Sequence, residues 1–244
     1  MVIKMGQTYR RTSITDRRRK RQLEVRKQLM LMIGIVLAIF VLIGMVVHSL
    51  RDREASTRAD DTITNTKYID KEPQFDVQLL QINDYSRPGI AIDKVNGIVV
   101  HYTANPGTTA RQNRDYFDGL AASHATYASS HFVIGLGGEI IQCIPCNEMS
   151  YASNERNGDT ISIECCIADE SGKFNDATYQ SLIQLTTWLM GRYDLSTDDV
   201  IRHYDVTGKA CPKYFVDHPA AWEQFHEDLV EYIDRYGVEK EKDK

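Results

Sequence analysis

An uncharged stretch of 22 residues, Leu29–Leu50, constrains this chain more than any other feature of its sequence. It consists mostly of Leu, Ile, Val and Met. At about 1.5 Å per residue, a helix of this length crosses a hydrocarbon core about 30 Å thick. A cleaved signal peptide is the alternative, but its apolar region spans only about 7–15 residues and ends at a small-residue cleavage site. Because charged residues follow here at 51–54, we predict a single N-terminal transmembrane helix that is retained.

The charge balance differs on the two sides of this stretch. Residues 1–28 hold ten basic and two acidic side chains, a net charge of +8, whereas residues 29–244 hold 19 basic and 32 acidic ones, a net charge of −13. Positive charge before a membrane helix keeps that end in the cytoplasm, so the remainder is expected to be extracellular. The acidic balance argues against nucleic-acid binding, which needs a basic surface. The N-terminal arginines are better explained by topology and by contact with anionic lipids.

The remaining sequence divides by composition into three parts. Residues 51–72 are polar and aperiodic, which is typical of a stalk. Residues 73–236 support one domain of ordinary size, and residues 237–244 form a charged tail. Within the domain we predict strands at 97–102, 131–135, 139–144, 160–167 and 199–203, and helices at 108–120, 176–192 and 219–236. Interleaved strands and helices indicate an α/β domain with a mixed central β-sheet flanked by helices.

Five cysteines lie in the predicted extracellular part: Cys143, Cys146, Cys165, Cys166 and Cys211. Because the number is odd, at least one thiol must be unpaired or bound to a metal. For the first four, one disulfide and burial as small apolar side chains are both open interpretations.

A candidate metal site begins with His203 and Cys211, which stand eight residues apart with Gly208 in the intervening turn. Imidazole and thiolate are both zinc ligands, and a catalytic zinc site takes three protein ligands and leaves one position open. His101, at the end of a predicted strand, is the best candidate for the third ligand. His131 is expected to be a structural, hydrogen-bonded histidine, because a fourth protein ligand would close the site.

Five motifs occur in an order that resembles one enzyme family. They are Ile98–Thr103 with His101, Ser130–Gly135 with the following Gly138–Gln142, Thr160–Glu164, His203–Asp205 and Gly208–Pro212. Over residues 95–235 the chain resembles the type 2, zinc-dependent N-acetylmuramoyl-L-alanine amidases, a family that includes T7-lysozyme-like enzymes and peptidoglycan recognition proteins.

The resemblance implies a role for each of five residues. His101, His203 and Cys211 match the zinc ligands, and Lys209 matches a lysine that stabilises the oxyanion. Glu164 matches a glutamate that serves as general base in some members. Other members use a tyrosine immediately before the His-Phe dipeptide, where this chain has Ser130. Two simpler interpretations stay open: Glu164 as a partner that holds a zinc-bound histidine, and Lys209 as a solvated loop residue.

The implied function is that of a membrane-anchored peptidoglycan hydrolase, which cleaves the amide between the muramic lactyl group and L-alanine with zinc as cofactor. Members that only bind peptidoglycan commonly lack the cysteine ligand, so Cys211 favours an enzyme. The alternatives are a non-catalytic module that binds or senses peptidoglycan and a zinc amidase that acts on soluble muropeptides.

Overall fold

A computed structural model describes residues 66–240, together with positions 23, 24, 27, 30–32, 34, 39 and 41–46. By its contacts the chain divides into two units, residues 1–58 and 59–244. In the described part of the chain, no helix is long and apolar enough to cross a membrane. Positions 41–46 are helical, but half of the predicted membrane segment 29–50 lies outside the described residues. So do most of the basic tail 1–28, stalk positions 51–65 and tail positions 241–244.

The second unit is built on a six-stranded sheet in the order β2-β5-β4-β6-β3-β7. The four strands β4, β6, β3 and β7 run parallel, whereas β5 is antiparallel to β4 and pairs in parallel with β2. The mixed sheet predicted from the sequence is therefore confirmed. The strand bounds are β2 Asp76–Val77, β3 Ile98–Tyr102, β4 Phe132–Ile134, β5 Ile140–Gln142, β6 Ile161–Cys165 and β7 Val200–Arg202.

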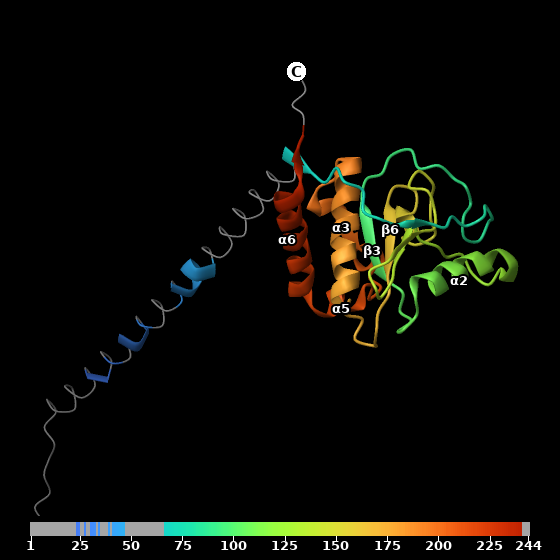
Figure 1. Cartoon of the computed structure of the whole chain (residues 1–244). Helices are drawn as coiled ribbons and strands as arrows, with labels where there is room; N and C mark the ends of the chain where they lie inside the picture. The colour runs from blue at the N-terminus through green and yellow to red at the C-terminus, as the bar shows by residue number, and fades with distance from the viewer. Residues whose placement is uncertain are drawn as a thin grey trace, which may run out of the picture. The chain divides into compact units, whose positions relative to one another are not determined.

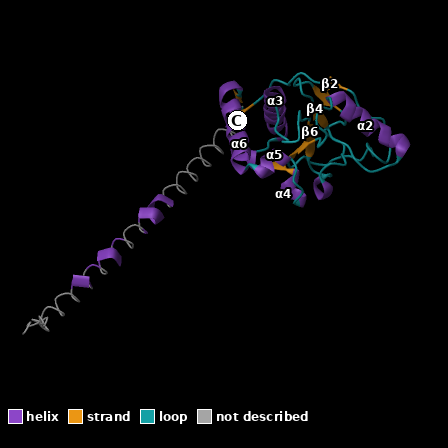
Figure 2. Cartoon of the chain, turned by 90° about the horizontal axis from the view of Figure 1, so that it is seen from below, coloured by secondary structure: helices purple, strands orange, loops and turns teal. Residues whose placement is uncertain are grey.

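Helices cover both faces of this sheet (Figure 1). They are α2 Ala110–Ser123, α3 Asp176–Tyr193, α4 His203–Thr207, α5 Lys213–Asp217 and α6 Pro219–Tyr236, with 3-10 turns η1 Asn154–Arg156 and η2 Thr197–Asp199. Helix α3 packs on one face with α6 against it, and α2 packs on the opposite face. Short helix α5 lies beside α6 (Figure 2), and α4 contacts η1 and the strands β3 and β7.

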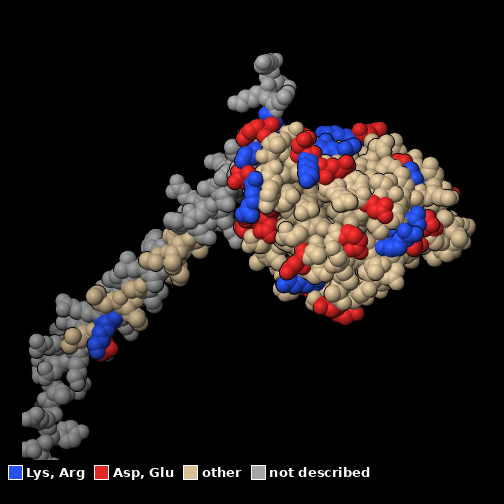
Figure 3. Space-filling model, in the orientation of Figure 1, with Lys and Arg blue, Asp and Glu red and all other residues tan. Residues whose placement is uncertain are grey.

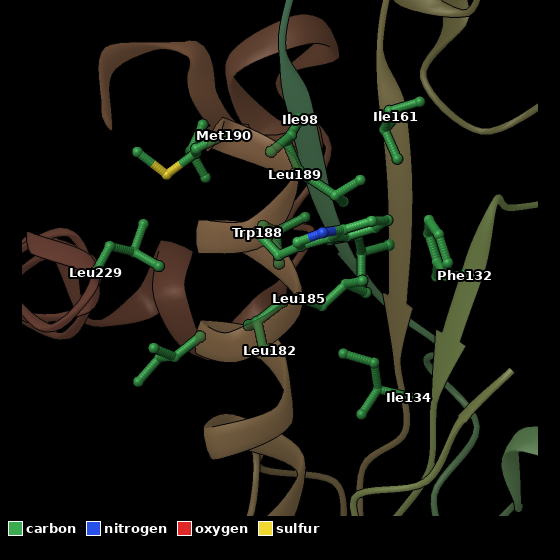
Figure 4. Close-up of a cluster of buried hydrophobic side chains, with 14 of the residues drawn as sticks. Ile98, Phe132, Ile134, Ile161, Leu182, Leu185, Trp188, Leu189, Met190 and Leu229 are labelled. Carbon is green, nitrogen blue, oxygen red and sulfur yellow. The ribbon is translucent and has the colours of Figure 1, made fainter. Parts of the chain in front are cut away.

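The main core lies between α3 and the sheet (Figure 4). Leu185 and Trp188 of α3 pack against Ile98 and Phe132, and both helix side chains are buried. Burying a side chain of this size stabilises the fold by about 1.5–3 kcal/mol. Because side chains alternate along a strand, Val133 points to the opposite face, where it joins a second cluster beneath α2. That second face carries the candidate site.

A short turn connects the antiparallel strands β4 and β5. This turn places Gly138 at a φ of +82°, which glycine adopts without a steric cost. The turn packs on α3, where the Ser181 hydroxyl donates to the Gly138 carbonyl at 2.7 Å. Asn175 caps the N-terminus of α3, because its side chain accepts a hydrogen bond from the Thr178 backbone N–H at 2.9 Å.

All five cysteines are free. Cys143, Cys165, Cys166 and Cys211 are buried, and Cys146 is partly buried. Burial raises the pKa of the Cys143 thiol to about 12, which keeps it protonated and unreactive at neutral pH. For the first four cysteines, the structure shows small, mostly buried side chains and no disulfide.

Acidic and basic side chains lie next to each other on the face of the domain shown in Figure 3. Among the exposed pairs, Lys213 and Asp217 are 2.9 Å apart on successive turns of α5. Solvent screens exposed pairs of this kind, so they contribute little to stability. The stability of this domain therefore comes mainly from its core.

The folded domain extends beyond the predicted limits of 73–236 at both ends. Strand β1 (Lys67–Tyr68), assigned to the stalk by the sequence, pairs antiparallel with β8 (Val238–Glu239) in the predicted tail. Ile69 is buried in the main core. Gly191 of α3 permits this approach, because a Cβ there would lie 3.1 Å from Tyr68 Cβ. Both segments have a polar composition, and the paired residues stand 170 positions apart. No local sequence pattern therefore predicts that they pair.

This boundary gives a first prediction. A chain of residues 73–244, which lacks β1 and Ile69, should unfold at a lower urea concentration than a chain of residues 59–244. We expect a loss of about 3 kcal/mol, from one buried isoleucine and a strand pair. Ile69→Ala in the longer chain should reproduce part of this loss. Equal urea midpoints of unfolding for the two chains would show that the folded domain begins at residue 73.

Candidate metal centre and active site

Three of the predicted site residues form a row across adjacent parallel strands. Glu164 on β6 lies directly opposite His101 on β3. On the other side of β3, Arg202 of β7 pairs with Val100, so the next residue, His203, continues the row beside His101. Parallel strands end at the same edge of a sheet, where ligands commonly bind. The shared register points Glu164 and His101 to the face that α2 covers, since Glu164 also pairs with Val133.

Cys211 reaches this row because the chain turns back after β7. Helix α4 starts at His203 and ends after one turn at Gly208, whose φ of +76° is left-handed. The Tyr204 backbone N–H donates to the Cys211 carbonyl at 2.9 Å and closes the turn. The Cys211 sulfur then lies 3.8 Å from His101 Nδ1. The local spacing in the sequence thus brings the thiol to the histidine on β3.

The ligand atoms of His101, His203 and Cys211 all lie within 4.8 Å of one another, and the three side chains are buried. Ligands of a tetrahedral zinc ion, at about 2.0–2.3 Å from the metal, lie about 3.6 Å from each other. The 3.8 Å between Cys211 Sγ and His101 Nδ1 is close to that separation. Two imidazoles and one thiol are donors that zinc prefers, so this set could hold a zinc ion with one position open.

Each histidine is held by a hydrogen bond on its far ring nitrogen. His101 Nε2 lies 3.1 Å from the Ser153 hydroxyl, and His203 Nε2 lies 3.0 Å from the Asn154 side-chain oxygen. Both contacts leave Nδ1 available for a metal. Sequence reasoning missed Ser153 and Asn154, because a Ser-Asn pair in a loop carries no pattern that distinguishes it from any polar turn.

The surroundings keep both histidines neutral, as metal binding requires. Burial lowers the pKa of His101 well below its ordinary value, and the nearby His203 and Lys209 lower it further. Burial and Lys209 also lower the pKa of His203. Without a metal, burial raises the pKa of the Cys211 thiol to about 12, although a hydrogen bond from the Tyr102 backbone and the charge of Lys209 oppose this. A bound metal must therefore displace the thiol proton.

Glu164 has a carboxylate oxygen with no partner. Its Oε2 atom is buried and makes no hydrogen bond within the described residues. Burial raises the pKa of Glu164 to about 7, with the charge of Lys209 opposing the shift. A carboxyl group with a pKa near neutrality is suited to proton transfer. The interpretation of Glu164 as a partner that holds a histidine is weakened, because Ser153 and Asn154 occupy the far nitrogens of both rings.

The raised pKa of Glu164 predicts how the stability of the metal-free protein depends on pH. The folded state binds the proton more tightly than the unfolded state, so this contribution is fully present below about pH 4.5 and is lost as pH rises through about 7. We expect a loss of roughly 1–3 kcal/mol across this window. Urea unfolding of chelator-treated wild type beside Glu164→Gln measures it, because glutamine removes this contribution alone. If the free energy of unfolding changes with pH in the same way in both proteins, the raised pKa does not belong to Glu164.

One pocket of about 400 Å³ contains all five residues singled out from the sequence: His101, Glu164, His203, Lys209 and Cys211. Aromatic side chains also line it, among them Tyr127 and Tyr151, whose ring centroids are 5.4 Å apart. Tyr127 is 59% exposed and stacks on Tyr85, which extends the aromatic surface beyond the pocket.

The two other residues considered at this end of the sheet have structural roles. Ser130 is fully buried and donates a hydrogen bond to the Phe132 carbonyl at 2.9 Å. His131 is buried and hydrogen-bonded as expected: its Nδ1 accepts from the Ser162 backbone N–H at 3.0 Å, and its Nε2 lies 2.8 Å from the Glu148 carbonyl. Neither is among the residues that line the pocket.

Comparison with known proteins agrees with this geometry. The sequence pattern of the N-acetylmuramoyl-L-alanine amidase family matches residues 92–214, which include all five site residues. The chain belongs to this amidase family. Its similar relatives include the N-acetylmuramoyl-L-alanine amidase CwlL of Bacillus licheniformis, 34% identical over 174 residues that make up 66% of this chain and 48% of CwlL. The amidase BlyA of Bacillus subtilis (strain 168) is 30% identical over 62% of this chain and 45% of its own length. This chain thus spans about half the length of these relatives.

Solved structures show the same fold. The catalytic domain of XlyA superposes with a TM-score of 0.55 at 27% identity and covers 64% of this chain and 99% of that domain. PlyL superposes with a TM-score of 0.56 over 68% of this chain and all of its own, at 21% identity, which supports the fold alone. The α/β architecture with a central sheet flanked by helices is therefore that of the family.

Proposed function

We propose that this protein is a membrane-anchored, zinc-dependent N-acetylmuramoyl-L-alanine amidase that hydrolyses the lactyl–L-alanine amide of polymeric peptidoglycan. The observation that carries the proposal is the convergence of His101, His203 and Cys211 in one pocket with a buried carboxylate oxygen of Glu164 that has no hydrogen-bond partner among the described residues. Family membership supports the amide as the bond that is cleaved.

Each residue has a chemical task in this proposal. Zinc, when bound by the three ligands, supplies a Lewis acid that activates water and polarises a carbonyl group. Glu164 accepts the proton of the attacking water at Oε2 and delivers it to the leaving amine. Lys209 lines the same pocket and supplies positive charge where the oxyanion develops. Tyr127 and Tyr151 form a wall against which the substrate packs.

Two observations support the membrane anchor. The stretch Leu29–Leu50 carries no charge over 22 residues and follows a segment of net charge +8. An anchor with a cytoplasmic N-terminus would hold the catalytic domain outside the membrane, where peptidoglycan lies.

Mass spectrometry of digested peptidoglycan tests the proposal. The zinc-loaded protein should release peptides with a free L-alanine amino terminus from insoluble wall and should leave intact lactyl groups on the glycan. Intact lactyl–alanine linkages after digestion with zinc present would contradict the enzyme and favour the binding module. If the protein cleaves soluble muropeptides but not insoluble wall, its substrate is the soluble fragment and not polymeric peptidoglycan. Recovery of the full chain in the soluble fraction of lysed cells would contradict the anchor.

A further inference from the structure

Two consecutive side chains of one turn contact both candidate histidine ligands. Ser153 Oγ lies 3.1 Å from His101 Nε2, and Asn154 Oδ1 lies 3.0 Å from His203 Nε2. The histidines belong to different elements, β3 and α4, and each is about 50 positions from its partner in sequence. A single loop therefore touches the far side of both rings.

The side chains around each ring define which ring nitrogen carries the proton. A side-chain amide oxygen only accepts hydrogen bonds, so His203 must donate from Nε2 and keep its lone pair on Nδ1. For His101, the protonated Cys211 thiol at 3.8 Å can donate to Nδ1, which leaves Nε2 to donate to the Ser153 hydroxyl. In both rings the nitrogen that faces away from the loop is the one able to bind a metal.

The turn is held by its own hydrogen bonds. The Asn157 side-chain oxygen accepts from the backbone N–H groups of Ala152 at 3.0 Å and Ser153 at 2.6 Å. Ser153 is 1% exposed. Asn154 has a φ of +52°, a left-handed conformation that asparagine tolerates better than most residues. Because neither feature involves a histidine, the loop presents its two polar groups without help from the ligands.

We propose that Ser153 and Asn154 are the positioning residues of the metal centre: both hold the orientation of the histidine ligands before metal binds, and Asn154 also fixes the tautomer of His203. This inference rests on the zinc site of the proposed function. The partner of a ligating histidine usually sets its tautomer, and removing such a partner costs about 10–100-fold in metal affinity or activity. Here one short turn supplies the partner for both ligands.

Zinc affinity of the full chain in detergent, measured by competition with a chromophoric chelator, tests the proposal. Asn154→Gly removes the amide and keeps the left-handed backbone free of strain, and Ser153→Ala removes the hydroxyl. Each should weaken zinc binding about 10–100-fold. Asn154→Asp and Ser153→Thr keep an accepting oxygen and should restore binding to within about threefold of wild type.

Ser150→Ala is the matched control. Ser150 is also 1% exposed and lies 2.8 Å from the Ser162 hydroxyl, so it loses a buried hydrogen bond without touching a ligand. Its zinc affinity should equal that of wild type. If Ser150→Ala weakens binding as much as Ser153→Ala, or if neither Ser153→Ala nor Asn154→Gly changes it, the inference is overturned.

A second measurement separates this inference from the proposed function. In metal-free protein with 15N-labelled histidine, the ring nitrogen shifts report the tautomer of each imidazole, and loss of signals in His101→Gln and His203→Gln assigns them. Both rings should carry the proton on Nε2 in wild type, and Asn154→Gly should abolish this preference at His203. A wild type that binds no zinc but shows this pattern would refute the zinc function alone. An Nδ1–H tautomer at His203 in wild type would refute the inference.

Discussion

Cys211→Ala should lose stoichiometric zinc and lower peptidoglycan hydrolysis by about a thousandfold or more. The thiol supplies one of three ligands whose donor atoms lie within 4.8 Å of one another, and two histidines alone hold zinc weakly. A Lewis acid contributes several kcal/mol to the transition state, and about 4 kcal/mol corresponds to roughly a thousandfold in rate. Metal content by atomic emission and release of L-alanine amino termini measure the two effects.

Cys143→Ala is the control for this prediction, because it makes the same chemical change at a buried thiol outside the pocket. Cys143 is fully buried in the cluster beneath α2. Its removal should cost some stability through a small cavity and leave zinc content unchanged. One zinc per chain in Cys211→Ala, with wild-type turnover, would show that the metal is held elsewhere.

Glu164→Gln should lower kcat by about 10²–10⁴ while zinc stays bound, which is the range attributed to a positioned general base. Glutamine has the same shape but cannot accept the proton of water. The rate of wild type should fall as pH drops through the pKa of Glu164, because protonation removes the base. Bound zinc favours the carboxylate, so this fall should lie below the metal-free pKa of about 7. Glu164→Gln should show no such fall. Rates on wall fragments across pH 5–9, with zinc content measured in parallel, give the result.

Glu155→Gln provides the matched control. Glu155 is an exposed carboxylate of η1 whose charge opposes the lowering of the His203 pKa, yet it does not line the pocket. Its kcat should stay within about twofold of wild type, as for most surface substitutions.

The alternative role of Glu164, as a partner that holds a histidine, predicts a different outcome: Glu164→Gln would then weaken zinc binding about as much as it lowers the rate.

Much of the architecture could be predicted because its signals are local. The sequence predicted strands at 97–102, 131–135 and 139–144 and a helix at 176–192, and the structure has β3, β4, β5 and α3 there. The limits of the domain could not be predicted in the same way. Strands β1 and β8 join segments 170 positions apart, both of polar composition, and only packing of Ile69 against the core reveals that they belong to the fold.

The sequence by itself determined two candidate ligands, because the spacing of His203 and Cys211 across Gly208 places both on one short turn. The candidate roles of Glu164 and Lys209 came from the family resemblance. Only the tertiary structure decided how they act together. Strand register sets Glu164 opposite His101, and burial raises the pKa of Glu164 to about 7. A loop about 50 residues away in sequence holds both rings through Ser153 and Asn154. These properties depend on which surfaces exclude water and which segments meet, and no local pattern of residues encodes that.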